Sequence, residues 1–119
     1  MDARIHQNWT IPVLIVIIFL SFSLAKAETV KTFEVTSKKY EFNPDTITVN
    51  LGDKVIIKAL ATDRDHGIGI KAFNINVPLP KGKRVTIEFI ADKKGAFTIF
   101  CSKFCGWKHS MMKGTLIVE

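Results

Sequence analysis

Four side chains that bind soft metal ions lie close together near the end of the chain. Residues 101–112 read CSKFCGWKHSMM, and the candidate ligands are Cys101, Cys105, His109 and Met112. Three residues separate the cysteines, three separate Cys105 from His109, and two separate His109 from Met112. Thiolate and thioether sulfur favour Cu(I), imidazole binds copper in either valence, and zinc sites rarely use a thioether. The stretch therefore predicts a copper site.

A further candidate ligand, His66, lies well upstream of this loop. It belongs to the polar stretch 62–67, which follows an expected buried strand. Loops at one end of a β-sandwich cluster in space, so we expect His66 to meet the 101–112 loop.

Three other side chains of the loop need an interpretation. Only one of the adjacent methionines can face a metal ion, and the spacing from His109 favours Met112. Met111 is then expected to pack against the protein. Trp107 is either an exposed loop aromatic or a contact for a redox partner.

The same residues allow other interpretations. Cys101 and Cys105 could form a structural disulfide in an exported domain. Cys105, His109, Met112 and His66 alone would resemble a mononuclear blue-copper set, which leaves Cys101 unused. The cysteine pair could also carry Cu(I) for delivery. Catalysis by the chain itself is not expected, because a filled copper centre has no open position for a substrate.

The elements that must position these residues are short strands. Hydrophobic residues alternate in several runs separated by turn residues such as Gly52-Asp53 and Lys81-Gly82-Lys83, and Pro78 and Pro80 are expected to end a strand. The expected strands cover 33–36, 46–51, 55–60, 73–77, 85–89, 97–101 and 115–118. This pattern predicts an all-β fold, an antiparallel sandwich or barrel.

The first 27 residues differ from the rest of the chain. The run 11–25 has no charged residue, and Ala25-Lys26-Ala27 fits a signal-peptidase site with cleavage before Glu28. The run is slightly short for a spanning helix, but a retained membrane anchor is the alternative. We therefore expect 1–27 to be a signal peptide or anchor and 28–119 to be one periplasmic or otherwise extracytoplasmic domain.

The size and charge of the chain exclude several classes of function. With 119 residues, 24% charged and 47% hydrophobic, the chain is neither a large multidomain enzyme nor a disordered protein. The formal net charge is +6, without a basic helix or a nucleic-acid motif, so nucleic acid is not an expected partner. Five basic side chains are expected near the copper end: Arg64, Lys71, Lys103, Lys108 and Lys113. They favour an acidic redox partner or an anionic membrane surface, or they simply keep the domain soluble.

The loop 101–112 closely resembles the dinuclear copper (CuA) loop of cytochrome c oxidase subunit II, and nitrous oxide reductase carries a related loop. His66 before Gly67 resembles the upstream histidine of that family. The stretch 40–49, YEFNPDTITV, with Gly52-Asp53, is similar to the opening strands of many cupredoxins. The resemblance covers nearly all of 30–119 and implies a cupredoxin-like Greek-key β-sandwich.

The resemblance also implies a ligand set for two copper ions. Cys101 and Cys105 would bridge both ions, and His66 and His109 would each bind one. Met112 would be a weak ligand to one ion, and the backbone carbonyl of Lys103 a weak ligand to the other. The centre would carry one electron, exchanged with a redox partner such as a cytochrome or an oxidase subunit.

Two departures from the oxidase pattern change the expected assembly. Oxidase subunit II usually begins with two membrane helices, whereas here one short apolar segment precedes the domain. Lys103 also stands where oxidases commonly have a glutamate that helps bind magnesium against the catalytic subunit. An ammonium group is not an oxygen ligand. We therefore expect no magnesium site and a standalone or loosely associated copper protein.

Overall fold

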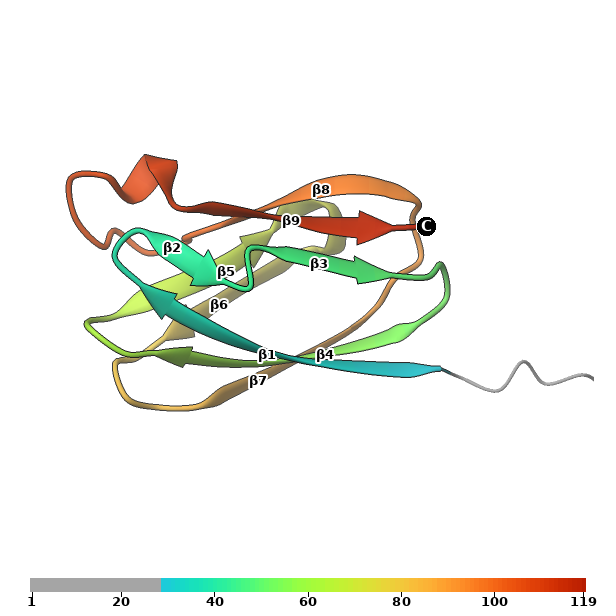
Figure 1. Ribbon diagram of the computed structural model, residues 1–119, viewed down its shortest axis with the longest axis horizontal. Helices are drawn as coiled ribbons and strands as arrows, with labels where there is room; N and C mark the ends of the chain where they lie inside the picture. Colours follow the sequence, from blue (N-terminus) through green and yellow to red (C-terminus); the bar gives the residue numbers. More distant parts are fainter. Residues whose placement is uncertain (1–28) are drawn as a thin grey trace, which may run out of the picture.

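The computed structural model describes residues 29–119, which form two packed β-sheets (Figure 1). One sheet has the strand order β2-β1-β4-β7, and the other has the order β3-β9-β8-β5-β6. The strands are β1 (Val30–Lys38), β2 (Glu41–Asn43), β3 (Thr46–Val49), β4 (Lys54–Ala61), β5 (His66–Ile70), β6 (Ile75–Leu79), β7 (Val85–Ile90), β8 (Gly95–Phe100) and β9 (Lys113–Val118). The all-β sandwich expected from the sequence is confirmed.

The sheets are mixed, so the expectation of purely antiparallel pairing was wrong. β1 runs parallel to β4, and β3 runs parallel to β9. The other neighbours in both sheets are antiparallel. The chain crosses between the sheets after β2, β3, β4, β6 and β7, so strands distant in sequence become neighbours with the same direction. Alternating hydrophobicity reports which face is buried but not the direction of the neighbouring strand.

The core lies between the two sheets and is built from the alternating positions that the sequence indicated. Ile47 and Val49 of β3 are buried, as are Val55 and Ile57 of β4 and Leu116 of β9. Removal of such aliphatic side chains from water stabilises the fold by about 1.5–3 kcal/mol each. Leu51, expected on the face of Ile47 and Val49, is instead 46% exposed, because the chain already turns at residues 51–52.

Two strands, β2 and β5, are absent from the expected set, and one expected strand starts later than predicted. All five residues of β5, HGIGI, are buried, so the strand lacks the alternation that marks a half-buried strand. The expected strand 73–77 begins only at Ile75, because Phe73 belongs to a short 3₁₀ turn, η1 (Lys71–Phe73). Pro78 does not end that strand. It pairs with Gly67 within β6, which is an edge strand, and an edge strand tolerates the missing N–H group.

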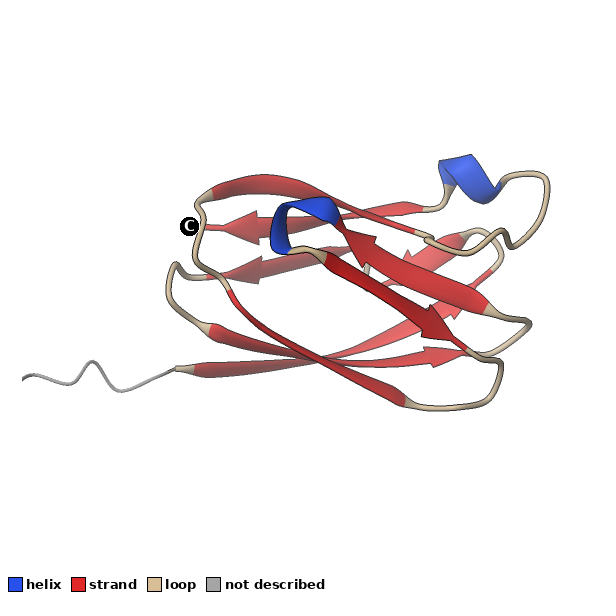
Figure 2. Cartoon of the chain, turned by 180° about the vertical axis from the view of Figure 1, so that it is seen from behind, coloured by secondary structure: helices blue, strands red, loops and turns tan. Residues whose placement is uncertain are grey.

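The two ends of the sandwich carry different parts of the chain. The 101–112 loop joins β8 to β9, contains a 3₁₀ turn η2 (His109–Met111), and lies at the same end as the β1–β2 and β4–β5 connections (Figure 1). The start of β1 and the C-terminus lie at the opposite end (Figures 1 and 2). The expected signal or anchor segment, 1–27, lies outside the described residues. Within residues 29–119, no helix has the length and apolar character needed to span a membrane.

Candidate metal centre

The candidate ligands are anchored where strands enter and leave one loop. Cys101 directly follows β8, and Met112 directly precedes β9. The Cys101 N–H donates to the Met112 carbonyl (N···O 3.3 Å), so the base of the loop continues the β8–β9 ladder. His109 begins η2, and Cys105 lies in the loop between. The sheet therefore holds both ends of the loop in place.

His66 comes from the other side of the site. It is the first residue of β5, which lies beside β8 in the same sheet. The loop placement expected for His66 was wrong by a small margin, because the polar stretch ends at Asp65 and the strand starts at His66. A strand residue is held more rigidly than a loop residue, which suits a ligand that must keep its position.

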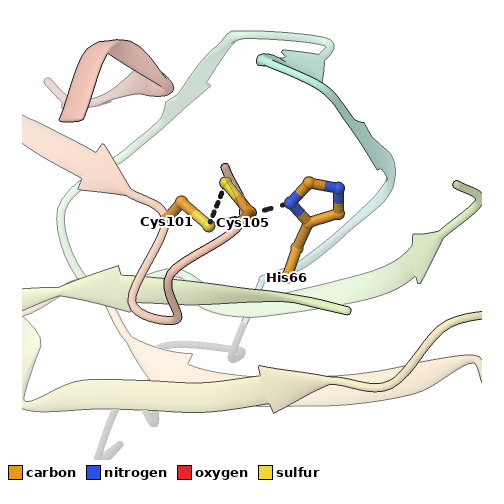
Figure 3. Close-up of side chains that lie close together, drawn as sticks. All are labelled: His66, Cys101 and Cys105. Carbon is orange, nitrogen blue, oxygen red and sulfur yellow. Dashed lines mark hydrogen bonds between the residues drawn. The ribbon is translucent and has the colours of Figure 1, made fainter. Parts of the chain in front are cut away.

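The side chains meet around the two sulfur atoms (Figure 3). The Sγ atoms of Cys101 and Cys105 are 3.4 Å apart, and both cysteines are free thiols. A disulfide bond would need about 2.05 Å. His66 Nδ1 lies 3.8 Å from Cys101 Sγ, and the nearest ligand-type atoms of His66, Cys101 and Cys105 all lie within 4.8 Å of one another.

The remaining predicted ligands complete the same cluster. His109 Nδ1 is 3.5 Å and Met112 Sδ is 3.8 Å from Cys105 Sγ. The Cys101 thiol donates a hydrogen bond to the Lys103 carbonyl oxygen at 3.1 Å. The structure thus brings together an atom from each of the six candidate ligands: two imidazole nitrogens, two thiols, one thioether and one carbonyl.

The burial of the cluster is uneven. His66, Cys105 and Met112 have no exposed surface, and Cys101 is 3% exposed, whereas His109 is only partly buried. Burial raises the pKa of the Cys105 thiol to about 12, and the hydrogen bond with Cys101 adds to this effect. A metal ion that binds here must therefore displace the Cys105 proton, so metal binding is coupled to proton release.

Asp63 orients His66, and the sequence analysis did not identify it. Its Oδ1 lies 2.7 Å from His66 Nε2, and its Oδ2 accepts a hydrogen bond from the Lys39 backbone N–H at 2.8 Å. A carboxylate only accepts hydrogen bonds, so Nε2 carries the proton and the lone pair of Nδ1 faces Cys101. Burial raises the pKa of Asp63, but these hydrogen bonds outweigh burial and hold the pKa below its usual value. The signal available was an acidic residue three positions before His66.

Gly67 allows the loop to approach His66 closely. A side chain at this position would place its Cβ 2.2 Å from Ser102 Oγ, and the Ser102 N–H approaches the Gly67 carbonyl at 3.4 Å. The absence of a side chain therefore lets the segment after Cys101 pack directly on β5.

The exposed side chains of the loop differ from the expectation. Met111 is 71% exposed, so its assignment to packing was wrong. Trp107 is 79% exposed, which is consistent with both of its interpretations. Phe104, which the sequence analysis left without a role, is 71% exposed, and its ring centroid lies 5.7 Å from that of His109.

Comparison with known proteins places the chain in a family. A family model described as Cupredoxin-like domain matches residues 11–118. Cytochrome c oxidase subunit 2 of Thermus thermophilus is 30% identical over 88 residues, which cover 74% of this chain and 65% of that protein. The chain spans between half and two thirds of the subunit 2 sequences that it matches from this organism, 52% and 65% of their lengths.

Solved structures agree with the sequence comparison. A chain of a heme-copper terminal oxidase dimer has a TM-score of 0.68 at 28% identity, and the match covers 75% of this chain and 65% of that chain. The periplasmic domain of subunit II of cytochrome oxidase from Bradyrhizobium japonicum also has a TM-score of 0.68. That match has 19% identity and covers 74% of this chain and 83% of that chain, so it supports the fold alone.

Proposed function

The chain belongs to the cupredoxin-like domain family and is homologous to subunit II of cytochrome c oxidase, and from this premise we propose that it is an electron-transfer protein with a dinuclear CuA-type copper centre. The centre carries one electron at a time and does not itself transform a substrate. The proposed ligands are His66, Cys101, the Lys103 backbone carbonyl, Cys105, His109 and Met112.

The observation that carries this proposal is the pair of thiols at the middle of the cluster. Cys101 and Cys105 face each other at 3.4 Å, and each also has an imidazole nitrogen beside it. Two thiolates could bridge two ions only if their sulfur atoms lie side by side. One histidine would then be available to each ion. Soft sulfur with imidazole is also the donor combination that suits copper.

Several residues of the chain would fix the positions of the metal ligands. The sulfurs are buried, His66 starts β5, and Cys101 and Met112 directly adjoin β8 and β9, so these ligands would keep their positions when the centre gained or lost an electron. Asp63 fixes which nitrogen of His66 faces the sulfurs. Met112 and the Lys103 carbonyl each offer a weaker donor, which adjusts the electron affinity of the ions more than it holds them.

A mononuclear copper site is the second candidate, because the loop by itself contains a compact set. His109 Nδ1 lies 3.5 Å and Met112 Sδ lies 3.8 Å from the Cys105 sulfur. His66 would supply the remaining nitrogen, and Cys101 would then have no ligand role. Against this candidate stands the close approach of Cys101 to both Cys105 and His66.

We further propose that the domain works outside the cytoplasm, exported or anchored by 1–27, and exchanges electrons with a cytochrome or an oxidase subunit. Lys103 forms an ion pair with Asp65 (Nζ···Oδ2 3.2 Å), so the side chain at this loop position is a cation engaged with the protein itself. This pairing favours a carrier that associates loosely over one that shares a magnesium ion with a partner subunit.

Copper titration of the reduced full-length chain tests the dinuclear proposal. The wild type should bind two copper ions, and both Cys101→Ser and Cys105→Ser should lose the bridged pair. Ser102→Ala, between the two cysteines, is the control and should still bind two. If Cys101→Ser binds copper with the same stoichiometry and spectrum as the wild type, the mononuclear candidate is correct instead.

A further inference from the structure

Half of the large exposed apolar side chains among residues 29–119 lie in the loop that carries the candidate metal centre. Residues 29–119 have six large hydrophobic side chains with high exposure, and three of them lie in the 101–112 loop. We call these three, Phe104, Trp107 and Met111, the apolar tip; each is at least 71% exposed. Large exposed apolar side chains that share one loop are a feature of interaction sites in soluble domains.

The apolar tip lies where an electron would leave or enter. His66 is fully buried, so His109 is the imidazole ligand candidate that reaches the surface. The Phe104 ring lies against it at 5.7 Å between centroids. A partner that covers Phe104 would therefore lie over the surface next to His109.

Two basic side chains lie beside the apolar tip. Lys108 Nζ lies 4.7 Å from the Trp107 ring centroid, and Arg64 lines a surface hollow together with Phe104. Among the described residues, no ion pair engages either cation, in contrast to Lys103 with Asp65. The nearby carboxylates of Asp63 and Asp65 are both occupied by internal hydrogen bonds.

A groove beside His109 extends the same charge pattern. It has a volume of about 640 Å³, and Phe100 contributes to its apolar lining. Lys71 and Lys113 line it together with His109 and the hydroxyl-bearing Ser110. The groove is large enough to accept side chains of a partner, and two lysines favour carboxylates among them. We call Arg64, Lys71, Lys108 and Lys113 the cationic rim.

We propose that the apolar tip and the cationic rim form the docking surface for an acidic electron-transfer protein that presents carboxylates around an apolar spot. This inference rests on the proposed electron-transfer function. A lipid surface is the less suitable occupant, because β1 begins at the opposite end of the sandwich from the loop (Figure 1). A chain held in a membrane through its N-terminal segment would therefore present the tip away from the lipid.

Charge-reversal variants of the full-length, copper-loaded protein test the surface. Reduced protein would transfer one electron to hexacyanoferrate(III), giving hexacyanoferrate(II), or to the cationic tris(phenanthroline)cobalt(III), giving the cobalt(II) complex. The anionic oxidant should react faster, and rising salt should slow it. In Arg64→Glu/Lys108→Glu/Lys113→Glu the rate with the anionic oxidant should fall by about tenfold or more, and the rate with the cationic oxidant should rise. Lys94→Glu, an exposed charge in the β7–β8 turn at the far end, is the matched control and should change neither rate.

An acidic plastocyanin and a basic cytochrome c serve as protein probes of the same surface. Trp107→Ala should weaken docking of the acidic protein at high salt, where only the apolar contact persists, and Leu51→Ala at the far end should not. Equal rates with both oxidants, or an equal effect of Lys94→Glu, would overturn the inference. So would rim-dependent binding to phosphatidylglycerol vesicles in place of the acidic protein. The copper content and spectrum of each variant test the dinuclear centre independently of the docking surface. A mononuclear centre would still show the effect of the charge reversals on the two electron-transfer rates.

Discussion

At the scale of single residues, the site depends on contacts that order the ligands. Asp63 accepts hydrogen bonds from both the Lys39 backbone and the His66 ring, so it links two loops to one ligand. Cys101, Cys105, His109 and Met112 were predictable because their types and spacing within one loop already indicate copper chemistry. Asp63 was not, because an acidic residue near a histidine is common and only the fold shows that the two touch.

Loss of the Asp63 carboxylate should loosen His66. Asp63→Ala frees the ring to rotate or change tautomer, so copper affinity should fall by about 10–100-fold. Asp63→Asn keeps a carbonyl oxygen that accepts from Nε2 and should restore most of the affinity. Asp65→Ala is the matched control, because Asp65 holds Lys103 and not His66. Competition with a Cu(I) chelator measures all three, and an equal loss in Asp63→Ala and Asp65→Ala would refute the orienting role.

The two adjacent methionines allow a matched comparison. Met112→Leu should keep both copper ions but shift the reduction potential, because an axial thioether tunes a copper centre more than it holds it. Met111→Leu should leave the potential unchanged, because Met111 is exposed and Met112 is buried against Cys105. Protein-film voltammetry gives both potentials. Loss of copper in Met112→Leu, or a matching shift in Met111→Leu, would contradict the weak-ligand assignment.

At the scale of elements, the site is the meeting of one hairpin loop with one buried strand. β8 and β9 were predictable from their hydrophobic residues, and the position of the loop between them follows from where the two strands end and begin. β5 was not, because its five buried residues include two glycines and resemble a turn more than a strand. The parallel pairs β1–β4 and β3–β9 were also missed, because direction follows from how the chain crosses between sheets.

Gly67 tests whether the contact between β5 and the loop positions the ligands. In Gly67→Ala the new Cβ would lie 2.2 Å from Ser102 Oγ, so the loop must move or the fold must strain, at about 1–3 kcal/mol. The second change in Gly67→Ala/Ser102→Ala removes that oxygen and should recover part of the loss. Chemical denaturation of the metal-free protein measures the loss of stability, and copper affinity measures the displacement of the ligand loop. Wild-type values for both in Gly67→Ala would show that the close approach is unimportant.

At the scale of the whole molecule, the two ends of the sandwich carry different features. The metal centre, the apolar tip and the cationic rim share one end, and the start of β1 and the C-terminus share the other (Figure 1). We propose that the domain is attached through the end where β1 starts and meets its redox partner at the other end. Net charge and the basic residues near the loop were visible in the sequence. The apolar tip was not, because exposure of Phe104 and Met111 follows only from the path of the loop.

The central claim is that two copper ions share one electron between Cys101 and Cys105. The most direct measurement is the electron paramagnetic resonance spectrum of the oxidised full-length protein, recorded together with its copper content. We expect two coppers per chain, one unpaired electron for the pair, and hyperfine splitting from two equivalent copper nuclei. One copper per chain with hyperfine splitting from a single nucleus would contradict the dinuclear centre.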